Sequence, residues 1–229
     1  SRASAVGIWQ FIKGTGKRYG LKTDRYVDER RDPIRATYAA AEYLNDLHRV
    51  FQNWYLAMAG YNAGEMRVLG SIMRNSSRDF WELVKNKKLP RETMNYVPKF
   101  LAAAIIGHNP ERFGFRRPIA TPFPELTKVK MPTGVKLSSI GAIIGVSSAK
   151  LKEYNPNILR SVTPPRGRDY EIWIPKDKED IAVKSYAAIK RTRGTVRYYA
   201  SAGSGAKHKV RSGENLALIA KKYGLSVRN

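Results

Sequence analysis

A segment of about twenty residues occurs twice in the chain, and this repeat limits the possible folds more than any other feature. Lys128–Ser147 reads KVKMPTGVKLSSIGAIIGVS and Lys207–Ser226 reads KHKVRSGENLALIAKKYGLS, with seven of twenty positions identical at an offset of 79 residues. Each copy combines a short basic strand, a Ser/Thr-Gly turn, an amphipathic helix and a terminating glycine. Such a repeat predicts a small module that occurs twice.

The first copy continues into a complete unit. Residues 148–154 have helical spacing, and the alternating segment 170–175 predicts a closing strand. We therefore expect a compact βααβ unit here. The sequence given ends at Asn229, before the second helix and closing strand of the second copy. Residues 192–206, between the copies, contain the Ser/Gly-rich composition of a flexible linker.

The first 115 residues have a helical pattern. Asp32-Pro33 is typical of a helix N-cap followed by proline at the first helical position. The apolar stripe expected after it consists of Ile34, Tyr38, Ala41, Leu44, Leu47 and Phe51. Further helices are expected at 53–61, around Met66, Leu69 and Met73, and from Pro90, where Pro98 either kinks the helix or separates it from residues 99–106. Because no period-two alternation occurs in this half, it predicts an all-α domain.

The charge is strongly positive and unevenly divided. Against 19 Asp and Glu stand 42 Lys and Arg, for a net charge of +23, of which +8 falls on residues 1–115 and +15 on residues 116–229. Such a field favours polyanions: nucleic acid, anionic lipid or an acidic cell-wall polymer. The alternative is a solvated surface without a specific ligand.

Several kinds of site are excluded or unsupported by composition. The absence of cysteine excludes disulfides, thiol nucleophiles and thiolate metal sites. His48, His108 and His208 are scattered without zinc-type spacing, so no metal is expected, and no cofactor motif occurs. No apolar run approaches the roughly eighteen residues of a membrane helix.

Three short blocks in the first half carry more specific information. They are Gly7–Ile12 (GIWQFI), Ala59–Glu65 (AGYNAGE) and Glu92–Lys99 (ETMNYVPK). In this order they resemble the consensus blocks of the lysozyme-like lytic transglycosylases of glycoside hydrolase family 23, and most of all the membrane-bound murein transglycosylase D type. Thr15–Leu21 and Arg30–Pro33 are also similar to that subgroup. The βααβ repeat resembles LysM modules.

The resemblance implies an α+β multidomain protein. An all-α, goose-type lysozyme-like domain would occupy residues 1–115 and a LysM-like βααβ domain residues 116–191. The linker 192–206 and the start of a second LysM module at 207–229 would follow. The implied partner is the glycan of peptidoglycan, with no nucleic acid and no cofactor. The implied location is the bacterial cell envelope, in the periplasm, with any membrane attachment through an upstream lipid anchor.

The implied reaction is cleavage of the β-1,4 bond between N-acetylmuramic acid and N-acetylglucosamine. The muramyl C6 hydroxyl captures C1 in place of water and leaves a 1,6-anhydro end. One glutamate serves first as acid and then as base, because the nucleophile is already part of the substrate.

That glutamate is not found in this sequence. In the family it belongs to a Glu-Ser block shortly before the Gly-x-x-Gln block, so the resemblance implies that it lies upstream of Ser1, in a longer protein. None of the acids of this sequence fits the role, because Asp24, Asp28, Glu29, Asp32, Glu65 and Glu92 all fall in other blocks or between them.

The resemblance also selects seven residues of the first half for contact with the sugar. These candidates are Gly7, Trp9, Gln10, Tyr61, Asn62, Glu92 and Tyr96. Structural alternatives stand beside them: Trp9 in the core, Gln10 in solvent, Asn62 at a helix corner, and Glu92 at the positive end of a helix. Ser1 matches a family serine but is a chain terminus.

In the LysM-like units, glycan contacts are expected from the loops. The candidates are Thr133, Gly134, Tyr154, Asn155 and Pro156 in the first copy and Ser212 and Gly213 in the second. The alternative for the first copy is a spacer without sugar affinity, because residues 164–167 form a long insertion.

The sequence therefore predicts a peptidoglycan lytic transglycosylase held on the cell wall by LysM-like modules. One alternative is a protein that binds peptidoglycan without cleaving it. Another is a basic nucleic-acid-binding protein, for which only Arg197-Tyr198-Tyr199 interleaves basic and aromatic residues.

Overall fold

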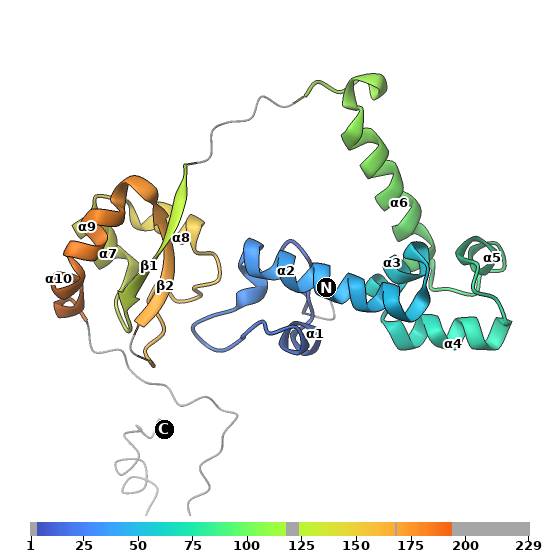
Figure 1. The fold of residues 1–229 in the computed structure, drawn as a ribbon, viewed down its shortest axis with the longest axis horizontal. Coiled ribbons are helices and arrows are strands. Elements are labelled where there is room, and N and C mark those ends of the chain that lie inside the picture. The colour runs from blue at the N-terminus through green and yellow to red at the C-terminus, as the bar shows by residue number, and fades with distance from the viewer. Residues whose placement is uncertain (1–3, 118–123, 168, 194–229) are drawn as a thin grey trace, which may run out of the picture. The chain divides into compact units, whose positions relative to one another are not determined.

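The computed structural model describes residues 4–117, 124–167 and 169–193, coloured in Figure 1. These residues belong to the first of two compact units, which spans Ser1–Val196. The expected second LysM copy, with Ser212 and Gly213, lies outside the described residues. Within the described part, a group of helices precedes a small α/β module.

The helical group confirms the expected all-α domain. Its helices are α1 (Lys13–Arg18), α2 (Pro33–Phe51), α3 (Trp54–Ala63), α4 (Glu65–Asn75), α5 (Phe80–Lys85) and α6 (Arg91–His108), with 3-10 turns at Glu29–Arg31 and Pro110–Phe113. Residues 4–117 contain isolated bridges but no extended strand. Of the two alternatives for Pro98, the separation of two helices is wrong, because Pro98 lies inside the continuous helix α6.

Helix α2 begins as the sequence predicts. One carboxylate oxygen of Asp32, Oδ1, accepts hydrogen bonds from the backbone N–H groups of Ile34 and Arg35, both at 3.0 Å. These donors have no partner within the helix, so the side chain satisfies them. Pro33 occupies the first helical position, where its missing N–H costs nothing.

The buried face of α2 differs from the expected stripe. Tyr38 is 76% exposed and Ile34 is also exposed. The buried residues are Ala36, Ala39, Ala40, Tyr43, Leu47 and Phe51. Helix α3 packs so closely on α2 that a Cβ on Gly60 would lie 2.8 Å from the Phe51 ring. Helices that pack closely favour small residues in their contact, whereas a prediction from hydrophobic spacing selects the large apolar residues.

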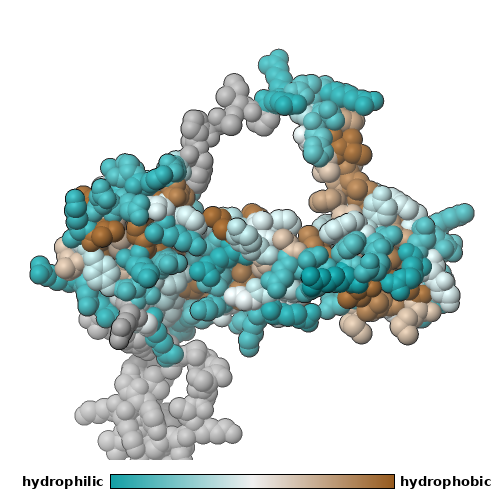
Figure 2. Space-filling view, in the orientation of Figure 1, coloured by the Kyte–Doolittle hydropathy of each residue, from teal (hydrophilic) through white to brown (hydrophobic). Residues whose placement is uncertain are grey.

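Helix α4 shows a similar shift. Val68 and Ile72 are its buried apolar residues, whereas Met66 is exposed and Met73 is 79% exposed. On α6, Phe100 and Ile105 are exposed as well. Figure 2 shows hydrophobic residues gathered along this helix. The described residues therefore leave part of the apolar surface of the helical group uncovered.

The α/β module confirms the expected βααβ order. Its elements are β1 (Leu126–Pro132), α7 (Leu137–Ile144), α8 (Ser148–Tyr154) and β2 (Asp169–Pro175), followed by a 3-10 turn (Lys176–Lys178), α9 (Glu179–Lys184) and α10 (Tyr186–Arg191). The strands are antiparallel, with Leu126 opposite Pro175 and Pro132 opposite Asp169. Gly145, in a left-handed conformation at φ 72°, ends α7 as expected. The last two helices were not predicted.

The two faces of this sheet have different environments. Val129, Met131, Ile172 and Ile174 are buried in the core of the module. Because side chains alternate along a strand, Lys128 and Trp173, which are paired across the sheet, project to the opposite face. That second face is free to line a site.

Residues 26–28 of the helical group pair with residues 157–159 of the module. The Asp28 N–H donates to the Asn157 carbonyl at 2.9 Å, the Leu159 N–H donates to the Tyr26 carbonyl at 2.7 Å, and Val27 bridges to Ile158. Backbone hydrogen bonds therefore bring the segment before α2 against the α8–β2 loop.

Candidate functional site

The first of the three blocks forms a tight turn from Gly7 to Gln10. The Gln10 N–H and the Gln10 Nε2 both donate to the Gly7 carbonyl, at 3.2 and 2.7 Å, and Val6 bridges to Phe11. Gly7 has a φ of 81°, and a Cβ there would lie 1.8 Å from the Arg30 carbonyl oxygen. Only glycine fits this position.

Arg30 holds the turn in place through hydrogen bonds to backbone carbonyls on either side of it. Its Nη1 donates to the carbonyls of Phe11 at 2.9 Å and Ser4 at 3.1 Å. Its Nε and Nη2 donate to the two carboxylate oxygens of Asp28 at 2.9 and 2.7 Å. Burial by itself would raise the pKa of Asp28, but the hydrogen bonds and charge of Arg30 outweigh it and lower that pKa. The buried pair is therefore ionised and positions the turn.

Trp9 and Tyr61 join the first block to the second. The Tyr61 hydroxyl donates to the Trp9 carbonyl at 2.8 Å, and the Trp9 indole N–H donates to Thr37 Oγ1 at 2.7 Å. Trp9 is half-buried, whereas Gln10 is exposed. The Tyr61 ring lies 5.2 Å from the ring of Tyr43 and 6.2 Å from that of Phe11.

Tyr61 also lies close enough to Tyr96 of the third block for the two to interact electrostatically. Burial, and then Tyr96, raises the pKa of Tyr61, and burial raises the pKa of Tyr96. Both hydroxyls therefore stay protonated at neutral pH and can act as neutral hydrogen-bond donors.

A second set of contacts joins the end of α3 to the start of α6. Asn62 Oδ1 accepts from Thr93 Oγ1 at 2.8 Å, and Asn62 Nδ2 lies 3.5 Å from Glu92 Oε1. Thr93 is buried and Glu92 is exposed. The fold therefore gathers the seven candidates of the first half in linked groups: Gly7, Trp9 and Gln10 on the turn, Tyr61 beside Trp9 and Tyr96, and Asn62 beside Glu92.

The sequence patterns did not reveal a charged cluster next to this site. Arg18 Nη1 donates to Glu65 Oε1 at 2.9 Å, and the Tyr43 hydroxyl donates to Glu65 Oε2 at 3.1 Å. The hydrogen bond from its own backbone N–H, followed by that from Arg18, lowers the pKa of Glu65. A carboxylate held in its ionised form suits ion pairing rather than proton donation. Glu65 is the last residue of the second sequence block and the first residue of α4, but its pairing with Arg18 was not predicted.

The loop candidates of the LysM-like module are largely occupied within the module. Gly134 is buried, and its N–H donates to the carbonyls of Thr163 and Pro164, both at 3.2 Å. Asn155 is 1% exposed. Its Oδ1 accepts from the Trp173 N–H at 2.7 Å, and its Nδ2 donates to the carbonyls of Leu151 and Trp173, both at 2.8 Å. Thr133 is buried and its hydroxyl donates to the Gly167 carbonyl at 3.2 Å.

Metal-binding groups and membrane-spanning helices are both absent from the described ranges. Residues 4–117, 124–167 and 169–193 contain no group of three or more His, Cys, Asp or Glu side chains that could hold a metal ion. Within the same ranges, no helix has both the length and the apolar character needed to cross a membrane.

Comparison with known families and proteins agrees with this arrangement. Residues 1–84 match the transglycosylase SLT domain, residues 125–191 the LysM-like domain of lytic transglycosylase MltD, and residues 208–229 the LysM domain. The chain is 36% identical over 236 aligned residues to the membrane-bound lytic murein transglycosylase D of Escherichia coli strain K12, and likewise to that of strain O6:H1.

The alignment covers the whole of this chain and 51% of each of these relatives, so the chain spans about half their length. An SLT domain, an MltD-type LysM-like domain and a LysM domain follow one another along this chain. The chain therefore combines a transglycosylase SLT domain with an MltD-type LysM-like domain and a LysM domain, and it is similar over its whole length to membrane-bound lytic murein transglycosylase D.

Proposed function

We propose that this chain takes part in the cleavage of peptidoglycan by a lytic transglycosylase reaction that leaves 1,6-anhydro-N-acetylmuramic acid. The observation that carries the proposal is the linkage of the three blocks through Tyr61. Its hydroxyl donates to the Trp9 carbonyl, and it interacts electrostatically with Tyr96. Residues so far apart in the sequence gain a common site only in the folded chain.

Each member of the site has a role that follows from its contacts. The Tyr96 hydroxyl makes no hydrogen bond to another described residue, so it is available to a sugar oxygen. Gln10 uses Nε2 within the turn and keeps its exposed Oε1 for a hydroxyl or acetamido N–H of the glycan. Trp9 forms a half-buried wall, Gly7 permits the turn, and Asn62 and Glu92 supply further polar groups at the start of α6.

The proton transfers need a carboxyl group with a raised pKa. Glu65 and Asp28 do not meet this need, because Glu65 pairs with Arg18 and Asp28 pairs with Arg30. Glu92, which belongs to the site, is exposed and is not enclosed in an apolar cleft. We assign the acid and base role to a glutamate upstream of Ser1, as the family resemblance implies. Because the substrate carries its own C6 hydroxyl nucleophile, one such group is sufficient.

The second half of the chain is proposed to hold the enzyme on its substrate. Residues 116–229 carry +15 of the net charge, which attracts the carboxylates of peptidoglycan peptides and the anionic polymers attached to the wall. We therefore propose the periplasmic side of the cell envelope as the place where the protein acts. The second LysM copy, with Ser212 and Gly213, is the proposed glycan-binding module. Thr133, Gly134 and Asn155 are proposed to contribute to wall binding by stabilising the fold of the first copy.

Digestion of purified murein sacculi by the full-length protein tests the reaction. Mass spectrometry should find 1,6-anhydromuropeptides, and Tyr96→Phe should lower their rate of release, while the exposed control Tyr38→Phe should not. Plain reducing-end products would instead identify a hydrolase.

Binding to sacculi without products would favour a wall-binding protein that does not cleave. A salt-sensitive shift of short DNA or RNA stronger than retention on sacculi would overturn the peptidoglycan proposal in favour of nucleic acid.

A further inference from the structure

The carboxylate of Glu65 joins three helices. Its Oε1 accepts from Arg18 Nη1 at 2.9 Å, and its Oε2 accepts from the Tyr43 hydroxyl at 3.1 Å. Arg18 is the last residue of α1, Glu65 is the first of α4, and Tyr43 lies in α2. These three residues form the Glu65 cluster. Because α1 follows directly on the first sequence block and Glu65 ends the second, the cluster connects two of the blocks that form the proposed site.

Charge fixes the direction of the hydrogen bond between Tyr43 and Glu65. The Glu65 carboxylate is held in its ionised form, because its pKa is lowered, so it can only accept. Burial, followed by the charge of Glu65, raises the pKa of Tyr43, so its hydroxyl keeps the proton that it donates. Hydrogen bonds to charged groups are stronger than those between neutral groups. The hydroxyl end of a tyrosine that is only 6% exposed is therefore held at one point.

The restraint on Tyr43 also limits the movement of Tyr61. The centroids of the two rings lie 5.2 Å apart, and their planes are inclined by 38°. The ring of Phe11, from the first sequence block, lies 6.4 Å from that of Tyr43 and 6.2 Å from that of Tyr61. The three rings therefore pack as one group. In a closely packed interior one ring cannot move without its neighbours, so the orientation of Tyr43 limits that of Tyr61.

The contribution of the cluster to stability is small. The Arg18 side chain is 62% exposed, and an ion pair with an exposed partner adds little to the free energy of unfolding. A phenylalanine ring would fill the same volume of the core as the ring of Tyr43. The hydroxyl and its charged acceptor add a fixed orientation of that ring. The arrangement therefore serves the position of the aromatic group more than its burial.

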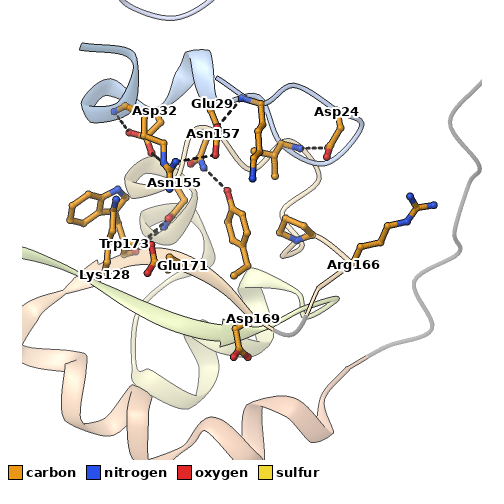
Figure 3. A pocket seen from close by; sticks show the side chains of 15 residues that line it. Asp24, Glu29, Asp32, Lys128, Asn155, Asn157, Arg166, Asp169, Glu171 and Trp173 are labelled. Atoms are coloured by element: carbon orange, nitrogen blue, oxygen red, sulfur yellow. Dashed lines mark hydrogen bonds and ion pairs between the residues drawn. The ribbon is translucent and has the colours of Figure 1, made fainter. Parts of the chain in front are cut away.

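The cluster is separate from a pocket at the junction with the module. That pocket has a volume of about 340 Å³ and is lined by Glu29 and Asp32 from the helical group and by Asn157 from the module (Figure 3). Asn157 Oδ1 is the one buried side-chain polar atom in the described ranges without a hydrogen-bond partner. No member of the Glu65 cluster is among the residues that line the pocket, so the cluster can be changed without altering the pocket wall.

We propose that the Glu65 cluster positions Tyr61 for the transition state of the cleavage reaction. The inference rests on the proposed function, in which Tyr61 contacts the sugar. Arg18 holds the carboxylate of Glu65, and that carboxylate holds the hydroxyl of Tyr43. The ring of Tyr43 then limits where Tyr61 lies against the turn that carries Trp9. A displacement of about 1 Å in a reacting site can lower a rate about a hundredfold, so a small loss of restraint has a measurable effect.

Steady-state kinetics of the full-length protein on soluble, uncross-linked murein strands test the proposal. Tyr43→Phe removes the hydroxyl and keeps the ring, and it should lower kcat at least fivefold while KM changes less than twofold. This split is expected because every substrate-binding group is still present, whereas the transition state requires their closer alignment. Tyr38→Phe, at an exposed tyrosine of the same helix, should leave both constants unchanged.

A second variant tests the cluster from the protein surface, where the fold is not at risk. Arg18→Ala should lower kcat at least twofold at an unchanged melting temperature, and Arg18→Lys should recover most of this loss because it restores the positive charge. In a protein that already carries Tyr43→Phe, Arg18→Ala should have no further effect, since both changes act through the same hydroxyl. The control Arg49→Ala removes an exposed ion pair with Asp46 at 3.5 Å and should leave kcat unchanged.

The NMR signals of Tyr61 separate this proposal from the proposed function. In protein labelled with ¹³C in its tyrosines, Tyr43→Phe should shift the ring signals of Tyr61 in the absence of substrate, whereas Tyr38→Phe should not. A wild-type protein that releases no 1,6-anhydromuropeptides would refute the proposed function. The Tyr61 signals would still decide whether the cluster positions that ring.

Four outcomes would overturn the proposal. The first is an unchanged kcat in Tyr43→Phe, with or without a rise in KM. The second is a fall in kcat no larger than the fall in the folded fraction, which would make the role of the cluster purely structural. The third is an additive effect of Arg18→Ala and Tyr43→Phe, which would mean that the ion pair does not act through the hydroxyl. The fourth is an unchanged set of Tyr61 ring signals.

Discussion

The hydroxyl of Tyr61 donates a hydrogen bond to the backbone carbonyl of Trp9 at 2.8 Å, across 52 positions of sequence. This contact joins the end of α3 to the turn that precedes α1. A main-chain carbonyl as acceptor means that Tyr61 positions the turn itself and not merely one side chain. The contact gives Tyr61 a structural role, in addition to the role in substrate binding that is proposed for it.

Tyr61→Phe separates these two roles. Loss of the hydrogen bond should lower the free energy of unfolding by about 0.5–1.5 kcal/mol, since the Trp9 carbonyl is only partly buried. The rate at which the full-length protein digests sacculi should also fall, by a larger factor than the small decrease in the folded fraction would cause. Denaturant unfolding and product analysis measure the two effects, with Tyr38→Phe as the exposed control. An unchanged digestion rate would restrict Tyr61 to a structural role.

Gly7→Ala should disrupt the turn. The new Cβ would lie 1.8 Å from the Arg30 carbonyl oxygen, at a φ of 81° that alanine rarely adopts. We expect a loss of at least about 1–3 kcal/mol in the free energy of unfolding. Gly14→Ala is the matched control: it lies in α1 with nothing within 4 Å of its Cβ position, and it should stabilise the chain by up to about 1 kcal/mol. Equal effects of the two substitutions would contradict this account.

The buried pair of Asp28 and Arg30 predicts a loss of stability in acid. The native pKa of Asp28 is lowered, so its stabilising effect is fully present above the ordinary Asp value of about 3.9 and is lost as pH falls through the native pKa. Unfolding measured from pH 6 to pH 2 should show this loss. Asp28→Asn should be less stable at pH 6, because Arg30 stays buried, and should show a shallower decline on acidification. A parallel decline in both proteins would exclude Asp28 as a source.

Asn155→Ala tests how the first LysM-like copy is held together. The side chain makes three hydrogen bonds to backbone groups of α8 and β2, and its removal leaves the Trp173 N–H and carbonyl unpaired. Thermal unfolding should show a loss of about 2–4 kcal/mol. The exposed control Asn86→Ala should cause little change. A stable Asn155→Ala protein with weakened glycan binding would instead make Asn155 a direct sugar contact.

The agreement between sequence and structure is greatest where the deciding forces are local. Asp32 caps α2, Gly145 ends α7, and the alternation of residues 170–175 produces β2, because each depends on chemistry within a few neighbouring residues. The three sequence blocks likewise contain the residues that meet at the proposed site. The buried face of α2 was mispredicted near its start, where Ala36, Ala39 and Ala40 are buried and the larger Ile34 and Tyr38 are exposed. Which face of a helix is buried depends on the elements that pack against it, and the spacing of apolar residues alone does not reveal those.

The sequence by itself determined the start of α2, the end of α7, the order of the βααβ module, the distribution of charge and the family resemblance. Only the tertiary structure decided that Tyr61 donates to Trp9, that Arg30 holds the Gly7–Gln10 turn, and that Asn157 keeps an unpaired oxygen in a pocket. The physical reason is the distance in the sequence between the residues that interact. Caps and alternation follow from the chemistry of adjacent residues, whereas these contacts join residues that are brought together only when the helical core and the module have packed.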